Sequence, residues 1–204
     1  FDCFNEGNIG NHLDFFASTE WHIDGEDYPV LLFRYKFTNE TAVKDQHNKI
    51  IKKQEISIRY GACVFKQQPL AFMVSNTHTN YPRYPVRWTS SDIQFNRKFN
   101  IAGQQQLELA RNLTPQRILS LAENLEHLQG TLMFHDSMNA FCYVSTQNIF
   151  QPLAPKKPIR DISMLRGYLR TLNAVHYERM QKHLTAIIRQ FKDDSHLHNM
   201  HHDH

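Results

Sequence analysis

Residues 114–130 read TPQRILSLAENLEHLQG and contain the clearest helix signal in the chain. Thr114 can cap the free amides of a first turn with its hydroxyl, and Pro115 suits the first helical position, where its missing N–H costs nothing. Gly130 offers a stop. The apolar residues recur at three- and four-residue spacing, at Ile118, Leu121, Ala122, Leu125 and Leu128. The stretch therefore predicts an amphipathic helix of about four turns that packs on another element.

The segments on either side of this helix are expected to be strands. Before it, Leu107 and Leu109 alternate with polar or small residues; after it, residues 132–134 and 140–145 are apolar and aromatic. A polar turn at residues 136–139 predicts that the last two segments form a hairpin. The region from Trp88 to Phe150 thus organises the predicted fold.

The N-terminal part of the chain predicts further strands. Residues 1–17 are expected to form a strand pair that turns near residues 7–11, and residues 24–27 an acidic, solvated turn. Residues 30–37 predict a strand that places Leu31, Phe33, Tyr35 and Phe37 on one face.

Two more segments complete the predicted sheet. Residues 39–54 are polar and lysine-rich without a helix or strand period, which predicts an exposed loop. Residues 55–65 and 70–75 are expected to pair as a hairpin, and the apolar run 70–74 favours a central strand.

Composition agrees with a globular domain of mixed structure. Of the 204 residues, 41% are hydrophobic and 21% charged, which is enough apolar material for a substantial core. The formal charge of +3 is too small for a surface that binds nucleic acid by charge, so no nucleic-acid partner is expected.

The fold class that these patterns predict is α+β, with an antiparallel sheet of about six to eight strands, one packed helix and a long C-terminal helix.

The C-terminal region predicts a separate helix. Prolines 152, 155 and 158 indicate a linker, and an apolar stripe from Leu165 to Phe191 begins after Asp161. We expect an α+β domain over residues 1–158, a helix over residues 159–192 packed on it or on a partner, and a disordered histidine-rich tail over residues 193–204. The second half of the stripe predicts self-association or binding of an unknown protein, through Leu184, Ile187, Ile188 and Phe191.

One loop interleaves aromatic and basic residues on a backbone stiffened by proline. Its candidate binding residues are Tyr81, Arg83, Tyr84, Arg87 and Trp88. Such a surface can stack bases or dock a peptide. In the alternative interpretation, the aromatic rings fold back over a sheet edge and the arginines are solvated.

Candidate metal ligands occur only in the tail, where His198, His201 and His202 can reach one zinc, copper or nickel ion without a preformed fold. The alternative is a terminus without a metal role, and no cofactor is expected. Cys3, Cys63 and Cys142 are far apart in sequence and lack metal or redox spacing, so a reducing compartment is expected. Two of them lie in apolar strand contexts and are expected to be small core residues.

No catalytic motif is apparent. The chain has no nucleophile elbow, and its seven glycines are scattered singly, without a phosphate-binding loop. An enzyme is therefore not expected, although a catalytic site assembled only in three dimensions stays open as an alternative.

Several of these segments resemble a known family in order and spacing. They are Phe95 to Phe99, residues 108–111, Leu113-Thr114-Pro115 and a hairpin that ends in Ile149-Phe150-Gln151-Pro152; residues 61–65 (GACVF) match a strand of small and aromatic residues further upstream. The chain resembles the C-terminal region of a bacterial family catalogued as domain of unknown function three-one-three-seven. The family's Pro-Ser after this point is Pro152-Leu153 here.

The resemblance implies an architecture and a membrane tether but no catalytic residue. Members of that family usually carry two membrane-spanning helices before this region, and a chain that starts at Phe1 is expected to be a fragment. We therefore expect a non-catalytic binding or interaction module on the cytoplasmic face of a bacterial membrane, attached only through segments upstream of Phe1 and itself soluble. A weaker alternative is single-stranded nucleic-acid binding through the loop from Tyr81 to Trp88.

Overall fold

The computed structural model describes residues 2–66, 70–76, 81–150, 158–171 and 174–192, and it divides into two compact units, Phe1–Gln147 and Asn148–His204. The elements of the first unit are η1 (Asp2–Asn5), β1 (Gly10–Ile23), β2 (Glu26–Lys44), β3 (Ile50–Phe65), β4 (Phe72–Ser75), β5 (Val86–Trp88), α1 (Ile93–Lys98), β6 (Asn100–Gly103), α2 (Gln106–Asn112), α3 (Pro115–Leu125), β7 (Thr131–His135) and β8 (Ala140–Ser145). Those of the second unit are α4 (Ile162–Thr171) and α5 (Val175–Lys192).

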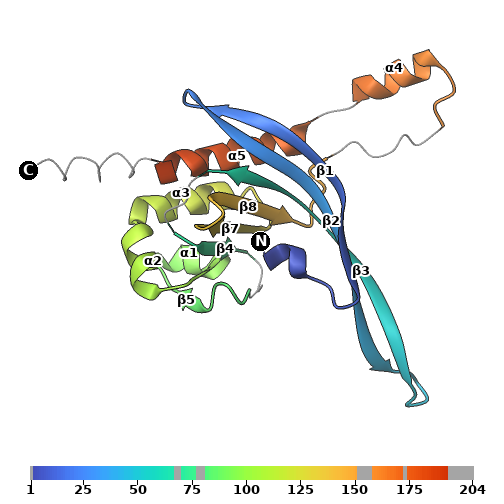
Figure 1. The fold of residues 1–204 in the computed structure, drawn as a ribbon, viewed down its shortest axis with the longest axis horizontal. Helices are drawn as coiled ribbons and strands as arrows, with labels where there is room; N and C mark the ends of the chain where they lie inside the picture. Colours follow the sequence, from blue (N-terminus) through green and yellow to red (C-terminus); the bar gives the residue numbers. More distant parts are fainter. Residues whose placement is uncertain (1, 67–69, 77–80, 151–157, 172–173, 193–204) are drawn as a thin grey trace, which may run out of the picture. The chain divides into compact units, whose positions relative to one another are not determined.

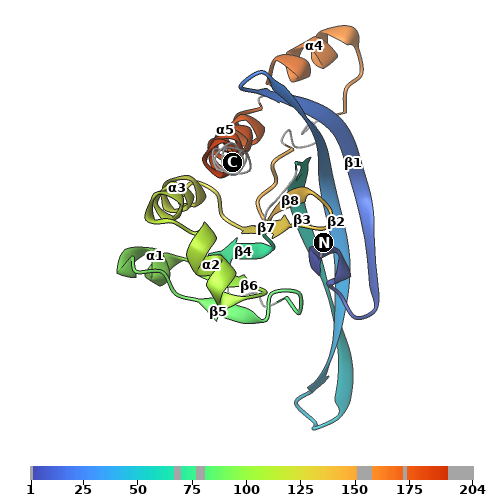
Figure 2. The same cartoon turned by 60° about the vertical axis from the view of Figure 1, so that its left-hand side comes forward.

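The first unit contains one antiparallel sheet of eight strands, in the order β1-β2-β3-β8-β7-β4-β6-β5. Helices α1, α2 and α3 lie together beside the part of the sheet that contains β4 and β7 (Figures 1 and 2). The predicted α+β class is confirmed. Strands β3 and β8 form the junction between the N-terminal strands and the rest of the sheet.

Helix α3 begins as the sequence predicts. The backbone N–H of Arg117 donates to the Thr114 hydroxyl over 3.4 Å, and Pro115 is the first helical residue. The buried face contains Ile118, Leu121 and Leu125.

The predicted end of this helix is wrong. Helix α3 stops at Leu125 after 11 residues, so it has about three turns rather than four. Gly130 has a different role: a Cβ atom added there would collide with the carbonyl oxygen of Val144. The glycine permits two backbone segments to approach each other next to β7.

The segment before α3 is helical, which corrects the strand predicted around Leu107 and Leu109. Residues 106–112 form α2, with Leu109 buried and Leu107 61% exposed. A Cβ added to Gly103 would lie 2.7 Å from a methyl carbon of Leu109, so the leucine packs directly on β6. Gln, Leu, Glu, Ala and Arg are all good helix formers, and this propensity outweighs a short alternation.

The hairpin predicted after α3 is confirmed. Strands β7 and β8 pair from Thr131↔Val144 to His135↔Ala140, and all their residues are buried. Asn139 closes the turn with φ +46°, a left-handed conformation that asparagine tolerates better than most residues.

The N-terminal segment does not form the predicted strand pair. It forms the short helix η1 and then the single strand β1. The Tyr35 hydroxyl donates to the carbonyl oxygens of Phe4 and Glu6, over 2.5 and 3.0 Å, and the Phe4 ring packs edge-on against Phe33. These contacts hold η1 over the sheet, so the segment is fixed by tertiary packing and not by strand pairing.

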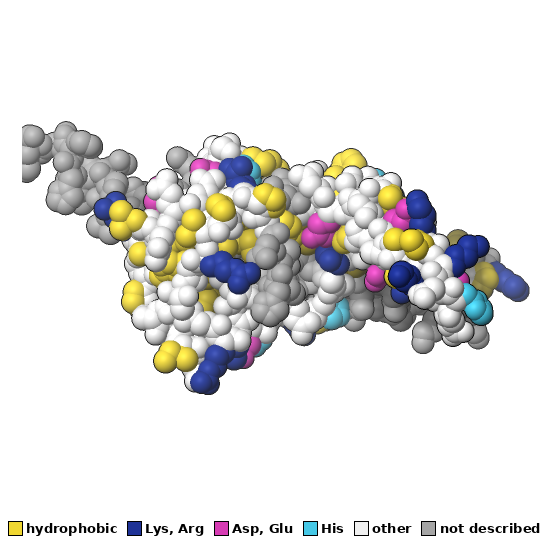
Figure 3. All heavy atoms as spheres, turned by 90° about the horizontal axis from the view of Figure 1, so that it is seen from below, with side chains coloured by type: hydrophobic (Ala, Val, Ile, Leu, Met, Phe, Trp, Pro, Cys, Tyr) yellow, Lys and Arg dark blue, Asp and Glu magenta, His cyan; other side chains and the backbone are white. Residues whose placement is uncertain are grey.

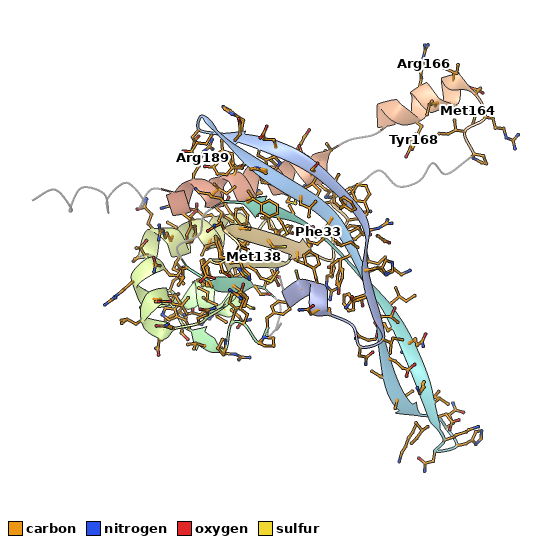
Figure 4. All side chains as sticks on the ribbon, in the orientation of Figure 1. Phe33, Met138, Met164, Arg166, Tyr168 and Arg189 are labelled. Atoms are coloured by element: carbon orange, nitrogen blue, oxygen red, sulfur yellow. The ribbon has the colours of Figure 1, made fainter. Side chains whose placement is uncertain are left out.

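The loop predicted over residues 39–54 is mostly wrong: residues 39–44 and 50–54 belong to β2 and β3, and only residues 45–49 form a turn. Strands β2 and β3 stay paired from Val30↔Val64 to Lys44↔Ile50, whereas β1 pairs with β2 only as far as Thr38. We call residues 39–55 the β2–β3 arm; it extends beyond the rest of the sheet, and its side chains stand out on both sides (Figures 1 and 4). Because neither face of the arm covers a core, its strands lack the alternation from which a strand is normally recognised.

The predicted pairing of residues 55–65 with residues 70–75 is also wrong. Strand β3 pairs with β2 and β8, and β4 pairs with β6 and β7. All four residues of β4 are buried, which confirms the central position expected for this apolar run.

The predicted core positions of β2 are confirmed, and the three cysteines join them. Phe33, Tyr35 and Phe37 are buried in one cluster with Cys3, Cys63 and Cys142. The Phe33 side chain, which is labelled in Figure 4, is fully buried in this cluster.

The second unit contains two helices where the sequence predicts one long helix from Asp161. Asp161 accepts the backbone N–H of Met164 over 2.8 Å and starts α4; the C-terminal helix is α5. The sequence between residues 171 and 175 is Leu-Asn-Ala, in which asparagine is a poor helix former. On α5 the buried residues are Met180, Leu184, Ile187 and Ile188. No helix in the part of the chain that the structure describes is both long and apolar enough to cross a membrane.

Candidate functional site

The structure places the two tyrosines of the predicted aromatic–basic loop in the interior. Tyr81 and Tyr84 are buried, and their hydroxyls donate to Glu6 Oε1 over 2.9 Å and to the Phe134 carbonyl over 3.1 Å. Their ring faces are therefore not available to stack on bases.

The other three residues of that loop lie closer to the surface but are not gathered into one basic groove. Arg83 pairs with Asp136, with Nη2 3.0 Å from Oδ1. Arg87 and Trp88 belong to the edge strand β5, opposite Ala102 and Ile101; the arginine is exposed and the tryptophan half-buried.

A cavity of about 330 Å³ lies in the first unit, and Tyr81 is the one predicted binding residue among its lining residues. The wall combines charged, amide and hydroxyl groups from η1's C-terminal side, β3, the loops flanking β4 and β7, and β8. The lining residues are Glu6, Arg59, Asn76, Tyr81, Gln129, Gly130, Thr131, Val144, Ser145 and Thr146.

Glu6, Arg59 and Tyr81 form the charged centre of this pocket. The Arg59 Nε lies 3.5 Å from Glu6 Oε2, and its guanidinium stands over the Phe37 ring at 5.0 Å. Glu6 Oε2 is buried and accepts no hydrogen bond from a described residue. Burial and then the negative charge of Glu6 raise the pKa of the Tyr81 phenol far above its ordinary value, so the phenol stays protonated and donates to the carboxylate.

The opposite wall of the pocket is polar, and most of its polar groups already form hydrogen bonds within the protein. The hydroxyls of Tyr143 and Ser145 donate to the Gln129 carbonyl, the tyrosine over 3.1 Å. The Asn76 side-chain oxygen accepts the backbone N–H of Gly130 over 3.1 Å. These bonds fix the wall, and they leave hydrogen-bonding capacity at its rim.

The described lining residues do not include the paired nucleophile and base that acyl transfer uses. Of the described residues that line it, none is a histidine or cysteine, and the Ser145 hydroxyl points to a backbone carbonyl instead of a base. Nucleophilic catalysis requires a nucleophile within hydrogen-bonding reach of a base. The arrangement can bind a polar ligand, and it offers no activated nucleophile among these residues.

A second candidate surface is the sheet face opposite the Phe33–Phe37 core, here called the outer face. The side chains of two paired residues on adjacent strands point to the same face of the sheet, and the side chains of successive residues along a strand point to opposite faces. Ile58 opposes Lys36 and Ile56 opposes Thr38, so both isoleucines share the outer face with Arg34 and its partner Phe15.

The outer face exposes large apolar side chains. Phe15 is 43% exposed, Ile58 37%, Ile56 60% and Ile50 67%. Figure 3 shows apolar side chains next to lysine and arginine side chains on one face of the molecule. Two of the cations on the outer face are paired, Arg34 with Asp14 at 2.5 Å and Lys52 with Glu40 at 2.7 Å.

The predicted metal ligands His198, His201 and His202 lie outside the described residues. Within the described part of the chain, no three His, Cys, Asp or Glu side chains are arranged to hold a metal ion.

Sequence reasoning missed Glu6, Arg59 and the outer face. No local pattern marks Glu6 or Arg59, because their pairing arises when η1 is held against β3. The outer face is not predicted as a whole, because Ile50 lies in the segment 39–54, for which the sequence predicts a loop.

Comparisons with known proteins found no relative: no protein-family model, no curated protein and no solved structure matches this chain.

Proposed function

We propose that this chain is a non-catalytic interaction module that binds a partner protein through its outer face. In the full-length protein, the module is tethered to a bacterial membrane and faces the cytoplasm; this tether rests on the family resemblance alone. The observation that carries the binding role is the exposure of four large apolar side chains on the outer face, Phe15, Ile58, Ile56 and Ile50.

The energetic reason is the cost of leaving these side chains in water. Fully burying an isoleucine or phenylalanine is worth about 1.5–3 kcal/mol relative to leaving it exposed. Single exposed apolar residues are common, whereas several along one face mark a surface that another molecule covers. The neighbouring Lys36 and Lys44 add positive charge, which favours a partner with acidic groups around an apolar centre.

A photo-crosslinking amino acid placed at Ile56 in cells tests this function. A control protein carries the same amino acid at Leu107, which is as exposed but lies on α2. We expect a discrete adduct from position 56 only, and mass spectrometry identifies the partner. The purified partner should then bind the Leu107→Ser variant normally and the Ile56→Ser, Ile58→Ser variant at least tenfold more weakly. Equal adducts from both positions would contradict the proposal, and an adduct of two copies of this chain would identify the partner as itself.

A second candidate function is binding of a small zwitterion in the pocket. Its volume of about 330 Å³ suits an amino-acid-sized ligand. Glu6 Oε2 accepts no hydrogen bond from a described residue, so a ligand ammonium can donate to it, and the partly exposed Arg59 guanidinium accommodates a carboxylate. Thermal shift against the free amino acids tests this role. We expect at least one stabilising ligand whose effect disappears in Arg59→Met; no stabilisation by any of them would exclude this class of ligand.

A further inference from the structure

The fold gathers all three cysteines of the chain into one buried cluster. Cys3, Cys63 and Cys142 come from η1, β3 and β8, and each is buried. The sulfurs of Cys63 and Cys142 are 3.1 Å apart, and Cys3 belongs to the same buried cluster. Thiols at such distant sequence positions meet only through the tertiary fold.

We propose that Cys63 and Cys142 form a cross-strand disulfide under oxidising conditions, with Cys3 as the alternative partner of Cys142. The site is a thiol cluster at the junction of the two parts of the sheet. Because Cys142 belongs to both possible disulfides, they exclude each other, and one thiol remains free in either state.

The backbone geometry permits the Cys63–Cys142 bond. These residues are directly opposite in the β3–β8 ladder. Opposed residues in an antiparallel pair have Cα atoms about 4.5–5.5 Å apart, inside the range of about 4.4–6.8 Å that disulfides span. Closing the bond requires an approach of about 1 Å from the present sulfur separation, which side-chain rotation can supply.

The cluster is protected until η1 opens. The Phe4 ring packs against the rings of Phe33 and Tyr35, and the Tyr35 hydroxyl donates to the Phe4 carbonyl. These contacts hold η1 in place. Burial raises the pKa of the Cys142 thiol, and contact with Cys3 and Cys63 raises it further, so little thiolate exists in the closed state. Oxidation is therefore slow and requires local opening of η1, a short helix next to the N-terminus.

The oxidant is a low-molecular-weight disulfide such as oxidised glutathione. One cysteine thiolate attacks a glutathione sulfur, forms a mixed disulfide and releases one glutathione thiolate. The second cysteine thiolate then attacks the protein sulfur of the mixed disulfide and releases the other glutathione. The protein loses two electrons and two protons, and the glutathione disulfide is reduced to two thiols.

The product links residues that are 79 positions apart and ties β3 to β8. A crosslink that closes a long loop removes conformational freedom from the unfolded chain. We expect the oxidised protein to melt several degrees above the reduced protein.

Thiol mapping of the full chain tests the proposal. Folded protein is treated with oxidised glutathione or with a reducing agent, alkylated after denaturation, and mapped by peptide mass spectrometry. We expect one Cys63–Cys142 disulfide and an alkylated Cys3. The Cys3→Ala variant should keep this disulfide, Cys63→Ala should switch to Cys3–Cys142, and Cys142→Ala should form neither.

The same treatment in denaturant provides the control, because the unfolded chain pairs its cysteines without a structural preference. Three free thiols after oxidation of the folded wild type, or the same mixture of pairs as in denaturant, would overturn the proposal. Stoichiometric metal in the purified protein that protects all three thiols would overturn it as well.

Discussion

Phe33 lies directly across the β2–β3 ladder from Gly61, and its ring occupies the space that a side chain at position 61 would need. A Cβ added to Gly61 would lie 2.5 Å from the ring carbon Cζ and would also collide with the carbonyl oxygen of Tyr143 on β8. Position 61 therefore requires glycine, because the Phe33 ring and the Tyr143 carbonyl both approach it closely. The carbonyl belongs to the backbone of β8 and cannot rotate away.

The first prediction concerns this position. Gly61→Ala forces either the Phe33 ring or strand β8 to move, and overpacking of this kind costs about 1–3 kcal/mol or more. We expect a lower urea midpoint by circular dichroism. Gly10→Ala is the matched control, because nothing lies within 4 Å of a Cβ there. An equal effect of both substitutions would contradict the close packing at Gly61.

The second prediction tests the buried face of α3. Leu121 is buried, so Leu121→Ala loses apolar contacts and leaves a cavity, at a cost of about 2–5 kcal/mol. Leu119 on the same helix is 54% exposed, and Leu119→Ala should cost much less. Denaturation of both variants compares the two faces of one helix. Equal denaturation midpoints would show that Leu121 is not part of a buried face.

The third prediction concerns alkaline pH. Burial raises the pKa of Tyr35 and of Tyr143 to about 12, and burial and Glu6 raise that of Tyr81 further. In the unfolded chain these phenols ionise near pH 10. Their stabilising contribution is therefore complete below about pH 10 and is lost as the pH rises toward the folded-state values. We expect the melting temperature to fall above about pH 10, and to fall less in Tyr81→Phe; an identical pH dependence in that variant would show that Tyr81 titrates normally.

The fourth prediction separates the β2–β3 arm from the core. The arm's side chains cover no core, so replacing residues 40–54 with an Asn-Gly turn between Asn39 and Glu55 should leave the melting temperature within a few degrees of the wild type. The shortened protein should keep its near-ultraviolet circular dichroism. Unfolding of the shortened protein would show that the arm supports the sheet.

The fifth prediction concerns the histidines of the C-terminal tail. If His198, His201 and His202 bind zinc without a preformed fold, calorimetry near pH 7.5 should give weak binding that depends strongly on pH. A chain that ends at Asp194 should lose it without a change in melting temperature. Zinc binding that survives this truncation would locate the metal elsewhere.

Local signals were sufficient for some elements and not for others. Thr114 and Pro115 mark the start of α3 because caps act within one turn, and the turn at residues 136–139 marks the β7–β8 hairpin for the same reason. The alternation of Leu107 and Leu109 predicts a strand wrongly, because six of the seven residues of α2 are good helix formers and Leu109 packs on β6 from a helix.

The candidate sites could not be predicted, because each depends on contacts between distant segments. Glu6 and Arg59 meet only when η1 packs on the sheet, and Cys63 meets Cys142 only through the β3–β8 ladder. The arm was missed for a different reason: a strand with solvent on both faces has no apolar period to detect.

The position of β8 beside β3 also sets an order of events during protein synthesis. Cys63 on β3 is made 79 residues before its partner Cys142 on β8, and a ribosome that adds roughly 5–20 residues per second needs about 4–16 s for that distance. The β2–β3 hairpin can form within microseconds, so for these seconds one edge of β3, with Ala62, Cys63 and Val64, has no strand beside it. An open apolar edge is where chains join each other. The nascent chain is therefore most vulnerable to aggregation in the interval before residue 145 leaves the ribosome, and a chaperone that acts on it should act then.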